Sequence, residues 1–341
     1  MRAAVLHGVG DLRVEELEDL APGPGEVLLG IESALTCGTD RKAYLRGHPR
    51  YLRSGGVLGH EYAGRILATG RGVTSVKEGD RVIAANSAPC GGCFQCERER
   101  WSLCENLTYV FGGFAEALVV PSVVVEHNLH LLPETLPMEI APIYEPLACA
   151  LKAVRDLAPQ ASSQALVVGA GALGLLLTAA LARRGVEVTV LDPHPDRLDL
   201  AHGYGATAVI AARKESSDVA TVRATINAGR GPELVIEAVG QPAAWALALE
   251  MSCAGGAVCL FGGCAVGSSV ELDTHRVHYE ELVVRGSHHH DPFAVAEAIE
   301  LLQDRSVPWK QLIGGEVGLD DLERVLAGEL YPTALKVAVR A

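Results

Sequence analysis

The segment Ala165-Leu-Val-Val-Gly169-Ala-Gly171-Ala-Leu-Gly174 indicates the architecture of the second half of the chain. Its aliphatic run predicts a strand, the G-x-G-x-x-G pattern a turn, and the Ala/Leu-rich residues 173–184 a helix. In such a unit the glycines let the backbone approach a pyrophosphate, and N-H groups at the helix start bind its charge. A glycine turn without a ligand is the alternative. The predicted dinucleotide site comprises Gly169, Gly171, Ala172, Leu173 and Gly174.

Asp192 ends the next apolar run, residues 186–191, and lies eighteen residues after Gly174. A carboxylate in this place can accept hydrogen bonds from the adenosine ribose of the cofactor. Because it repels a 2′-phosphate, the sequence favours NAD, with NADP less favoured. Arg197 could contact adenine or a phosphate, or it could be a solvated surface charge.

Short apolar strands recur after this unit, at residues 208–210, 234–238, 257–261 and 282–285, with helical stretches between them. Near-continuous apolar strands are typical of a parallel sheet that is buried on both faces. We therefore predict an α/β fold with a doubly wound parallel sheet, a Rossmann domain, over residues 149–285.

The N-terminal half differs from this pattern of alternating strands and helices. Residues 27–31, 62–68, 81–85 and 115–120 are short β-type runs separated by Gly, Pro and Asp. This pattern predicts a small irregular barrel over residues 1–148. Two domains are also the default for 341 residues, because single cores seldom grow that large.

Four cysteines lie within fifteen residues, in Cys90-Gly-Gly-Cys93-Phe-Gln-Cys96 and at Cys104. The spacing C-x2-C-x2-C-x7-C can close four thiolates around one zinc ion. An iron-sulfur cluster and two disulfides are the alternatives. A zinc ion with four protein ligands has no position for water, so this lobe, residues 90–104, would be structural.

Composition narrows the class of partner. A formal net charge of -13 opposes binding to nucleic acid and to anionic membranes, and no apolar segment of about 20 residues could span a bilayer. Five further cysteines are scattered along the chain, which does not suggest a disulfide framework. We expect a cytoplasmic protein that acts on a small molecule.

The predicted barrel also contains Cys37, His60, Glu61 and Glu145, which could form a second zinc site. Cys37 and the pair His60-Glu61 each lie at the end of an apolar stretch flanked by glycine. One thiolate, one imidazole and a carboxylate would leave a position for water or substrate. The alternative is a structural role, since a His beside a Glu is usually a satisfied polar pair.

The order of these motifs resembles the zinc-containing medium-chain alcohol and polyol dehydrogenases. The resemblance rests on Cys37-Gly-Thr-Asp40, Gly59-His-Glu61, the four-cysteine lobe, Glu145-Pro-Leu147 and the glycine turn. It implies a GroES-like catalytic barrel, here residues 1–148 and 286–341, with the Rossmann domain inserted. It also implies two zincs per subunit, one catalytic and one structural, and a homodimer or homotetramer.

The same resemblance assigns roles to individual residues. Cys37 and His60 would bind the catalytic zinc, with Glu61 or Glu145 as a third ligand, and Glu145 could instead hold the zinc-bound water. Asp40 would orient His60, and Thr39 would relay the substrate proton. A Glu-Pro sequence at this place is similar to the sorbitol, glucose and threonine dehydrogenase branch.

These roles imply a zinc-dependent oxidation of a secondary alcohol, in a polyol, sugar or cyclitol-like substrate, to the ketone by hydride transfer to NAD. L-threonine 3-dehydrogenase and general alcohol dehydrogenase are alternatives, and a non-catalytic nucleotide-binding relative is an alternative of a different class. His288-His-His290 is expected in an exposed or interface loop.

Overall fold

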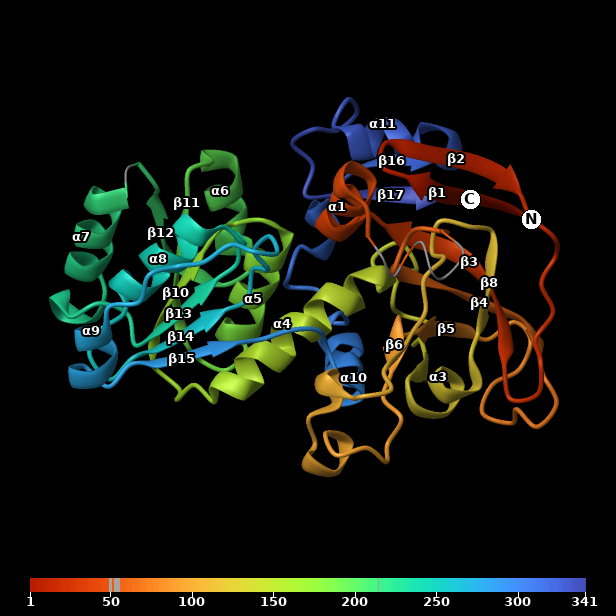
Figure 1. Cartoon of the computed structure of the whole chain (residues 1–341), viewed down its shortest axis with the longest axis horizontal. Coiled ribbons are helices and arrows are strands. Elements are labelled where there is room, and N and C mark those ends of the chain that lie inside the picture. Colours follow the sequence, from red (N-terminus) through yellow and green to blue (C-terminus); the bar gives the residue numbers. More distant parts are fainter. Residues whose placement is uncertain (49–50, 52–55, 214) are drawn as a thin grey trace. The chain divides into compact units, whose positions relative to one another are not determined.

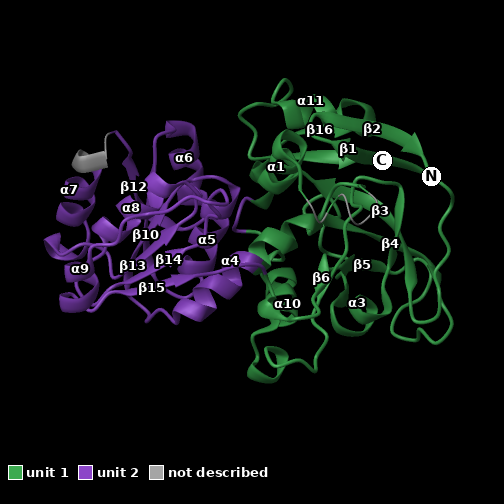
Figure 2. Cartoon of the chain, viewed as in Figure 1, with its two compact units in different colours: residues 1–148, 290–305, 309–341 green, residues 149–289, 306–308 purple. Residues whose placement is uncertain are grey.

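The computed structural model describes residues 1–48, 51, 56–213 and 215–341 of the chain, which forms two compact units. Unit 1 comprises residues 1–148, 290–305 and 309–341, and unit 2 comprises residues 149–289 and 306–308 (Figure 2). The first boundary falls inside helix α4 (Tyr144–Leu157), between Ala148 and Cys149.

Unit 2 is built on a six-stranded parallel sheet (Figure 1). Its spatial order is β12-β11-β10-β13-β14-β15, so the first strand in sequence is central and the order of strand addition reverses between β10 and β13. In open sheets of this kind, ligands bind at the carboxyl ends of the strands where the order reverses. The strands are β10 (Gln164–Val168), β11 (Glu187–Asp192), β12 (Ala206–Ala211), β13 (Leu234–Glu237), β14 (Ala257–Leu260) and β15 (Val283–Gly286).

Helices connect these strands and complete the core of unit 2. Leu166 and Val235 on adjacent central strands pair in register and are fully buried, as expected for strands that are covered on both faces. The connecting helices are α5 (Ala172–Ala182), α6 (Pro195–Gly203), α7 (Glu215–Thr225), α8 (Pro242–Met251) and α9 (Thr274–Tyr279).

Unit 1 contains a sheet in the order β16-β17-β3-β4-β5-β9, with β8 also paired to β3. Only the β16–β17 pair is parallel. The C-terminal strand β17 lies beside β3, where Ala338 pairs with Leu35, so the last strand of the chain joins a sheet that is otherwise formed mainly by residues 27–131. The strands are β3 (Val27–Leu35), β4 (Glu61–Thr69), β5 (Arg81–Ala84), β8 (Ala117–Val120), β9 (Leu129–Leu131), β16 (Ile313–Gly318) and β17 (Lys336–Arg340).

Shorter elements surround this sheet. Strands β1 (Arg2–Gly8) and β2 (Asp11–Glu16) form a hairpin, and β6 (Ser87–Ala88) pairs with β7 (Thr108–Tyr109). The helices of unit 1 include α1 (Gly38–Arg46), α3 (Ser122–His127), α10 (Pro292–Leu301) and α11 (Leu322–Ala327). Within the described residues, no helix combines the length and the apolar character that crossing a bilayer requires.

Two features near residue 290 differ from the sequence analysis. The predicted return to the barrel domain was at residue 286, but Gly286 is the last residue of β15 and pairs with Leu260, so unit 1 resumes only at His290. The sequence predicted an exposed or interface loop for His288-His-His290, and the exposed alternative is wrong for its last member. His290 is only 2% exposed, because it contacts Asn86 inside unit 1.

Candidate active site and metal centres

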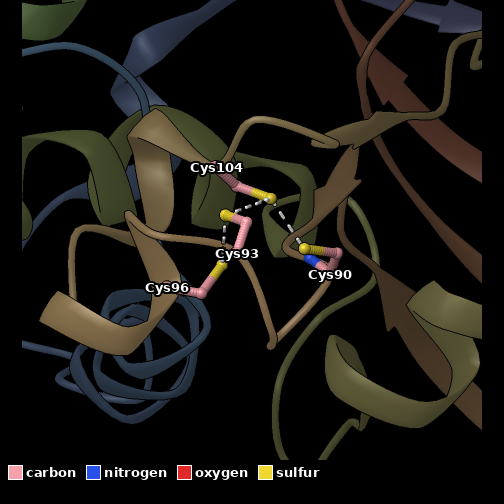
Figure 3. Close-up of side chains that lie close together, drawn as sticks. All are labelled: Cys90, Cys93, Cys96 and Cys104. Carbon is pink, nitrogen blue, oxygen red and sulfur yellow. Dashed lines mark hydrogen bonds between the residues drawn. The ribbon is translucent and has the colours of Figure 1, made fainter.

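The four cysteines of the lobe converge on one point (Figure 3). Their sulfur atoms all lie within 4.8 Å of one another, and Cys93 Sγ is 3.5 Å from Cys96 Sγ and 3.9 Å from Cys104 Sγ. Four sulfurs at ~2.3 Å from a central zinc would be about 3.8 Å apart. The donor set and its spacing therefore fit a tetrahedral zinc ion.

Both alternatives for the lobe fit less well. All four cysteines are free thiols, and the separation of 3.5 Å between Cys93 and Cys96 is far longer than a disulfide bond of about 2.0 Å. An iron-sulfur cluster places several iron atoms between its thiolates and would hold them further apart. Hydrogen bonds from the backbone N-H groups of Cys96 and Glu105 lower the pKa of Cys93 to about 6, whereas burial raises the pKa of Cys96 to about 12. The assignment to zinc therefore rests on the donor set and its spacing.

A second donor set forms at the start of helix α1. Cys37 caps this helix, and His60 and Glu61 lie at the start of strand β4. One ligand atom of each of the three residues lies within 4.8 Å of the others. The helix N-terminus stabilises negative charge on the Cys37 sulfur. A thiolate, an imidazole and a carboxylate fit a zinc ion that keeps one position for a further ligand.

Asp40 links the cysteine and the histidine of this set. Its Oδ2 accepts a hydrogen bond from the Cys37 backbone N-H at 2.8 Å, and its Oδ1 lies 3.1 Å from His60 Nδ1. The carboxylate thus closes the first turn of α1 and fixes the imidazole ring. A proton on Nδ1 leaves the Nε2 lone pair of His60 for a metal.

Tyr51 completes this network, and the sequence analysis missed it. Its hydroxyl donates to Asp40 Oδ1 at 2.8 Å and lies 2.7 Å from His60 Nδ1. Burial, with a further contribution from the charge of Asp40, raises the pKa of Tyr51 well above its usual value, so the hydroxyl keeps its proton. Nothing local in the sequence marks this tyrosine, because its two partners are nine and eleven residues away.

Lys336 is the second residue that sequence reasoning missed. It lies on β17, is 3% exposed, and its Nζ donates to Glu61 Oε1 at 2.6 Å and also to Oε2. Burial raises the pKa of Glu61 to about 7, against the opposing attraction of Lys336. Burial by itself would lower the pKa of Lys336, but the charge of Glu61 raises it above the usual value. Lys336 therefore remains an ammonium ion. A single lysine inside the apolar strand was the available signal.

Glu145 and Thr39 are placed differently from these ligand candidates. Glu145 is not in the group formed by Cys37, His60 and Glu61. Its Oε1 accepts a hydrogen bond from Asn86 Nδ2 at 3.0 Å, although its charge is close enough to contribute to the raised pKa of Glu61. Thr39 is the second residue of α1 and is partly buried.

The glycine turn lies between β10 and α5. Gly169 has φ +101°, a conformation that favours glycine, and Gly171 caps α5. A Cβ on Gly174 would lie 1.8 Å from the Gly169 carbonyl oxygen, so this position is closed to any side chain. Ala172 and Leu173 begin the helix, whose first-turn N-H groups have no partner inside it.

Asp192 joins this turn to the end of β11. Its Oδ2 accepts from the Ala170 backbone N-H at 2.7 Å, and its Oδ1 accepts from the His194 backbone N-H at 2.8 Å. The imidazole Nδ1 of His194 is also 2.8 Å from Oδ1. Three contacts therefore fix the carboxylate at the carboxyl end of β11. Arg197 is the third residue of α6 and is partly exposed.

Both units match families of known proteins. Residues 23–133 match the alcohol dehydrogenase GroES-like domain, and residues 172–304 match the zinc-binding dehydrogenase domain. An L-threonine 3-dehydrogenase of Bacillus velezensis is 31% identical over 307 residues, 88% of this chain and 86% of the relative. This chain is a zinc-containing medium-chain dehydrogenase.

Solved structures extend the similarity over the whole dehydrogenase. A Sinorhizobium meliloti protein described as a zinc-binding dehydrogenase, bound to NADP, is 28% identical with a TM-score of 0.89, over 100% of this chain and 99% of that one. The 2R,3R-butanediol dehydrogenase of Bacillus subtilis is 25% identical with a TM-score of 0.85, over the same shares of both chains. The fold class predicted from the sequence, a GroES-like domain with a Rossmann domain, is confirmed.

The glycine turn of this dehydrogenase yields a matched pair of variants. Gly174→Ala should lower the free energy of unfolding by at least ~2 kcal/mol, because its Cβ would overlap the Gly169 carbonyl oxygen. Gly171→Ala should leave stability within about 0.5 kcal/mol, because no atom lies within 4 Å of its Cβ position and its φ is -68°. Urea unfolding measures both. Equal stability of the two variants would contradict the close packing of the turn.

Lys336→Met should destabilise the dehydrogenase by about 3 kcal/mol, because it leaves the Glu61 carboxylate buried without a partner. The double variant Lys336→Met/Glu61→Gln should recover most of this loss, since neither remaining side chain is charged. Lys310→Met is the matched control: its ion pair with Glu139 is exposed, and its loss should cost less than about 0.5 kcal/mol. The buried pair is not a stabilising contact if Lys336→Met and Lys310→Met unfold at the same denaturant concentration.

Proposed function

We propose that this dehydrogenase oxidises a secondary alcohol, in a small polyol, sugar or cyclitol-like substrate, to the ketone, with NAD as the hydride acceptor. The observation that carries the proposal is the convergence of Cys37, His60 and Glu61, with Asp40 and Tyr51 holding the histidine. A donor set built only for structure would be closed by a fourth protein ligand, as the cysteine lobe is.

Different residues of this chain would have different roles in this reaction. Cys37 and His60 would hold the catalytic zinc, with Glu61 or Glu145 as the carboxylate that completes the site or holds its water. When bound, zinc lowers the pKa of a coordinated hydroxyl and polarises its oxygen, and nicotinamide accepts the hydride. Thr39, in the first turn of α1, would pass the substrate proton outward.

The ion pair with Lys336 limits the ability of Glu61 to bind zinc. Both oxygens of the Glu61 carboxylate accept from the ammonium group, so ligation of zinc by Glu61 would compete with a buried ion pair. This competition supports a role in which Glu61 exchanges with water or substrate. Glu145 would then be the carboxylate that holds a water at the zinc site.

The proposed count of two zincs per subunit is tested by metal analysis. Wild type should hold about two zinc ions, and Cys37→Ser about one. Turnover of Cys37→Ser should fall roughly a thousandfold, because the polarising metal is worth several kcal/mol. Binding of NADH, followed by fluorescence, should be unchanged, since the glycine turn lies in unit 2.

Cys93→Ser is the control for this experiment. It should lose the lobe zinc and lower stability, because binding of a structural metal contributes to folding. If wild type holds zinc in the lobe alone, the chain is a non-catalytic nucleotide-binding relative, which is the alternative from a different class.

NAD is proposed over NADP because Asp192 is held at the ribose end of the predicted site by Ala170 and His194. The Sinorhizobium neighbour is bound to NADP, and kcat/KM measured with both cofactors tests the assignment. We expect kcat/KM to favour NAD in wild type, and Asp192→Asn to narrow the preference at least ~10-fold, since it removes the charge but keeps the acceptor for Ala170. Asp196→Asn, an exposed charge in α6, should leave the preference unchanged. A wild type that prefers NADP would contradict the assignment.

The substrate class rests on Glu145-Pro146, the sequence that resembles the polyol branch, and a screen of NADH formation tests it. The screen compares polyols, aldoses, inositols, primary alcohols and L-threonine as substrates. L-threonine is the second candidate, because the Bacillus velezensis relative is an L-threonine 3-dehydrogenase. General alcohol dehydrogenase is the third, and it would be supported by equal activity on simple primary alcohols.

We also propose a cytoplasmic homodimer or homotetramer. Strand β15 is an edge of the parallel sheet, and its Val283 and Val284 are 56% and 37% exposed. An apolar edge strand is a template for pairing with a second copy, and sedimentation equilibrium measures the assembly directly. The thiolate sites require reduced cysteines, which supports a reducing compartment.

A further inference from the structure

His290 is set apart from the two histidines that precede it. His288 is exposed and His289 partly buried, whereas His290 is 2% exposed. His289 has a left-handed φ of 61°, a strained conformation for a residue other than glycine. Asp291 then caps helix α10 by accepting from the Ala294 N-H at 2.9 Å. The backbone on both sides of His290 is therefore constrained.

Asn86 receives the imidazole of His290. Its Oδ1 lies 2.6 Å from His290 Nε2, and its Nδ2 donates to Glu145 Oε1 at 3.0 Å. Asn86 is 3% exposed and Glu145 is 6% exposed, so both contacts are shielded from water. The Asn86 backbone is fixed as well, because its carbonyl oxygen accepts from the Val110 N-H at 2.8 Å.

The chemistry of an amide makes these two contacts interdependent. The oxygen of Asn86 can only accept a hydrogen bond and its NH2 group can only donate. His290 must therefore donate from Nε2, and this donation holds the amide with its NH2 group toward Glu145. A rotation of the amide by 180° would place its oxygen against a carboxylate oxygen and its NH2 group against the Nε2-H of His290. The hydrogen bonds of Asn86 with His290 and with Glu145 would then both be lost, at a position shielded from water.

We propose that His290 is a positioning residue that acts through Asn86 to hold the Glu145 carboxylate in its working orientation. The inference rests on the proposed function, in which Glu145 completes the zinc site or holds its water. Groups that orient a metal-site carboxylate commonly affect activity or metal affinity 10- to 100-fold. His290 itself contacts neither substrate nor zinc in this account.

Three histidine variants test the proposal in the zinc-loaded, full-length enzyme. His290→Leu removes the donor and should lower kcat/KM for the alcohol roughly 10- to 100-fold. His290→Gln keeps an N-H donor near the position of Nε2 and should stay within about threefold of wild type. His288→Gln, an exposed neighbour, is the control and should match wild type. Loss of activity in His290→Gln equal to that in His290→Leu overturns the proposal.

Two further readouts separate positioning from a structural role. The dissociation constant for NADH, measured by fluorescence, should be the same in wild type and His290→Leu. In a Glu145→Ala background, His290→Leu should change kcat/KM by less than about threefold, because its effect passes through Glu145. Additive effects of the two substitutions, or weaker NADH binding in His290→Leu, overturn the proposal.

Asn86→Asp covers the case in which His290→Leu does not fold. The side chains have the same shape, but the aspartate presents an oxygen to Glu145 Oε1 in place of an N-H donor. We expect kcat/KM to fall roughly 10-fold or more although His290 is intact. Wild-type activity in Asn86→Asp overturns the proposal while the proposed function stands. If the wild-type protein holds no second zinc and shows no turnover, both the proposed function and the inference that rests on it are wrong.

Discussion

Unit 1 depends on a buried ion pair between Glu61 and Lys336, two residues that are 275 positions apart in the sequence. A carboxylate with no exposed surface is costly unless a cation compensates it, and this cation arrives only with the last strand. Strand β17 therefore does more than complete a sheet beside β3. It brings the countercharge to the proposed metal site, and it couples formation of that site to folding of the whole of unit 1.

The proposed catalytic metal site draws its residues from segments of little local structure. Cys37 begins a helix and His60 precedes a strand, and neither element orients a ligand by itself. Asp40 makes the connection, because one oxygen closes the helix turn and the other meets the imidazole. Tyr51 then shares this contact, so that the proton on His60 Nδ1 is held from two sides. The cysteine lobe, by contrast, needs no such support, since all four of its ligands lie within fifteen residues.

The polar side chains around Glu145 follow the same physical rule as the pair at Glu61. Each buried acceptor is matched by a donor from a distant part of the chain: Asn86 from the segment before β6, and His290 from the segment before α10. In a low-dielectric interior, such chains of hydrogen bonds fix orientation more strongly than they do in water. Orientation is what a carboxylate beside a metal requires, because a small rotation changes which lone pair it presents.

The sequence alone predicts the features that depend on short-range spacing. It predicted the glycine turn between strand and helix, the parallel sheet and the convergence of Cys90, Cys93, Cys96 and Cys104, because residues a few positions apart meet through local backbone geometry. It also paired Asp40 with His60, through a resemblance and not through geometry. Tertiary structure alone decided that Lys336 neutralises Glu61, that Tyr51 joins His60, and that His290 is buried against Asn86. These contacts follow from strand order and from how the chain returns to unit 1, and no periodicity or local propensity encodes which distant donor will meet a buried acceptor.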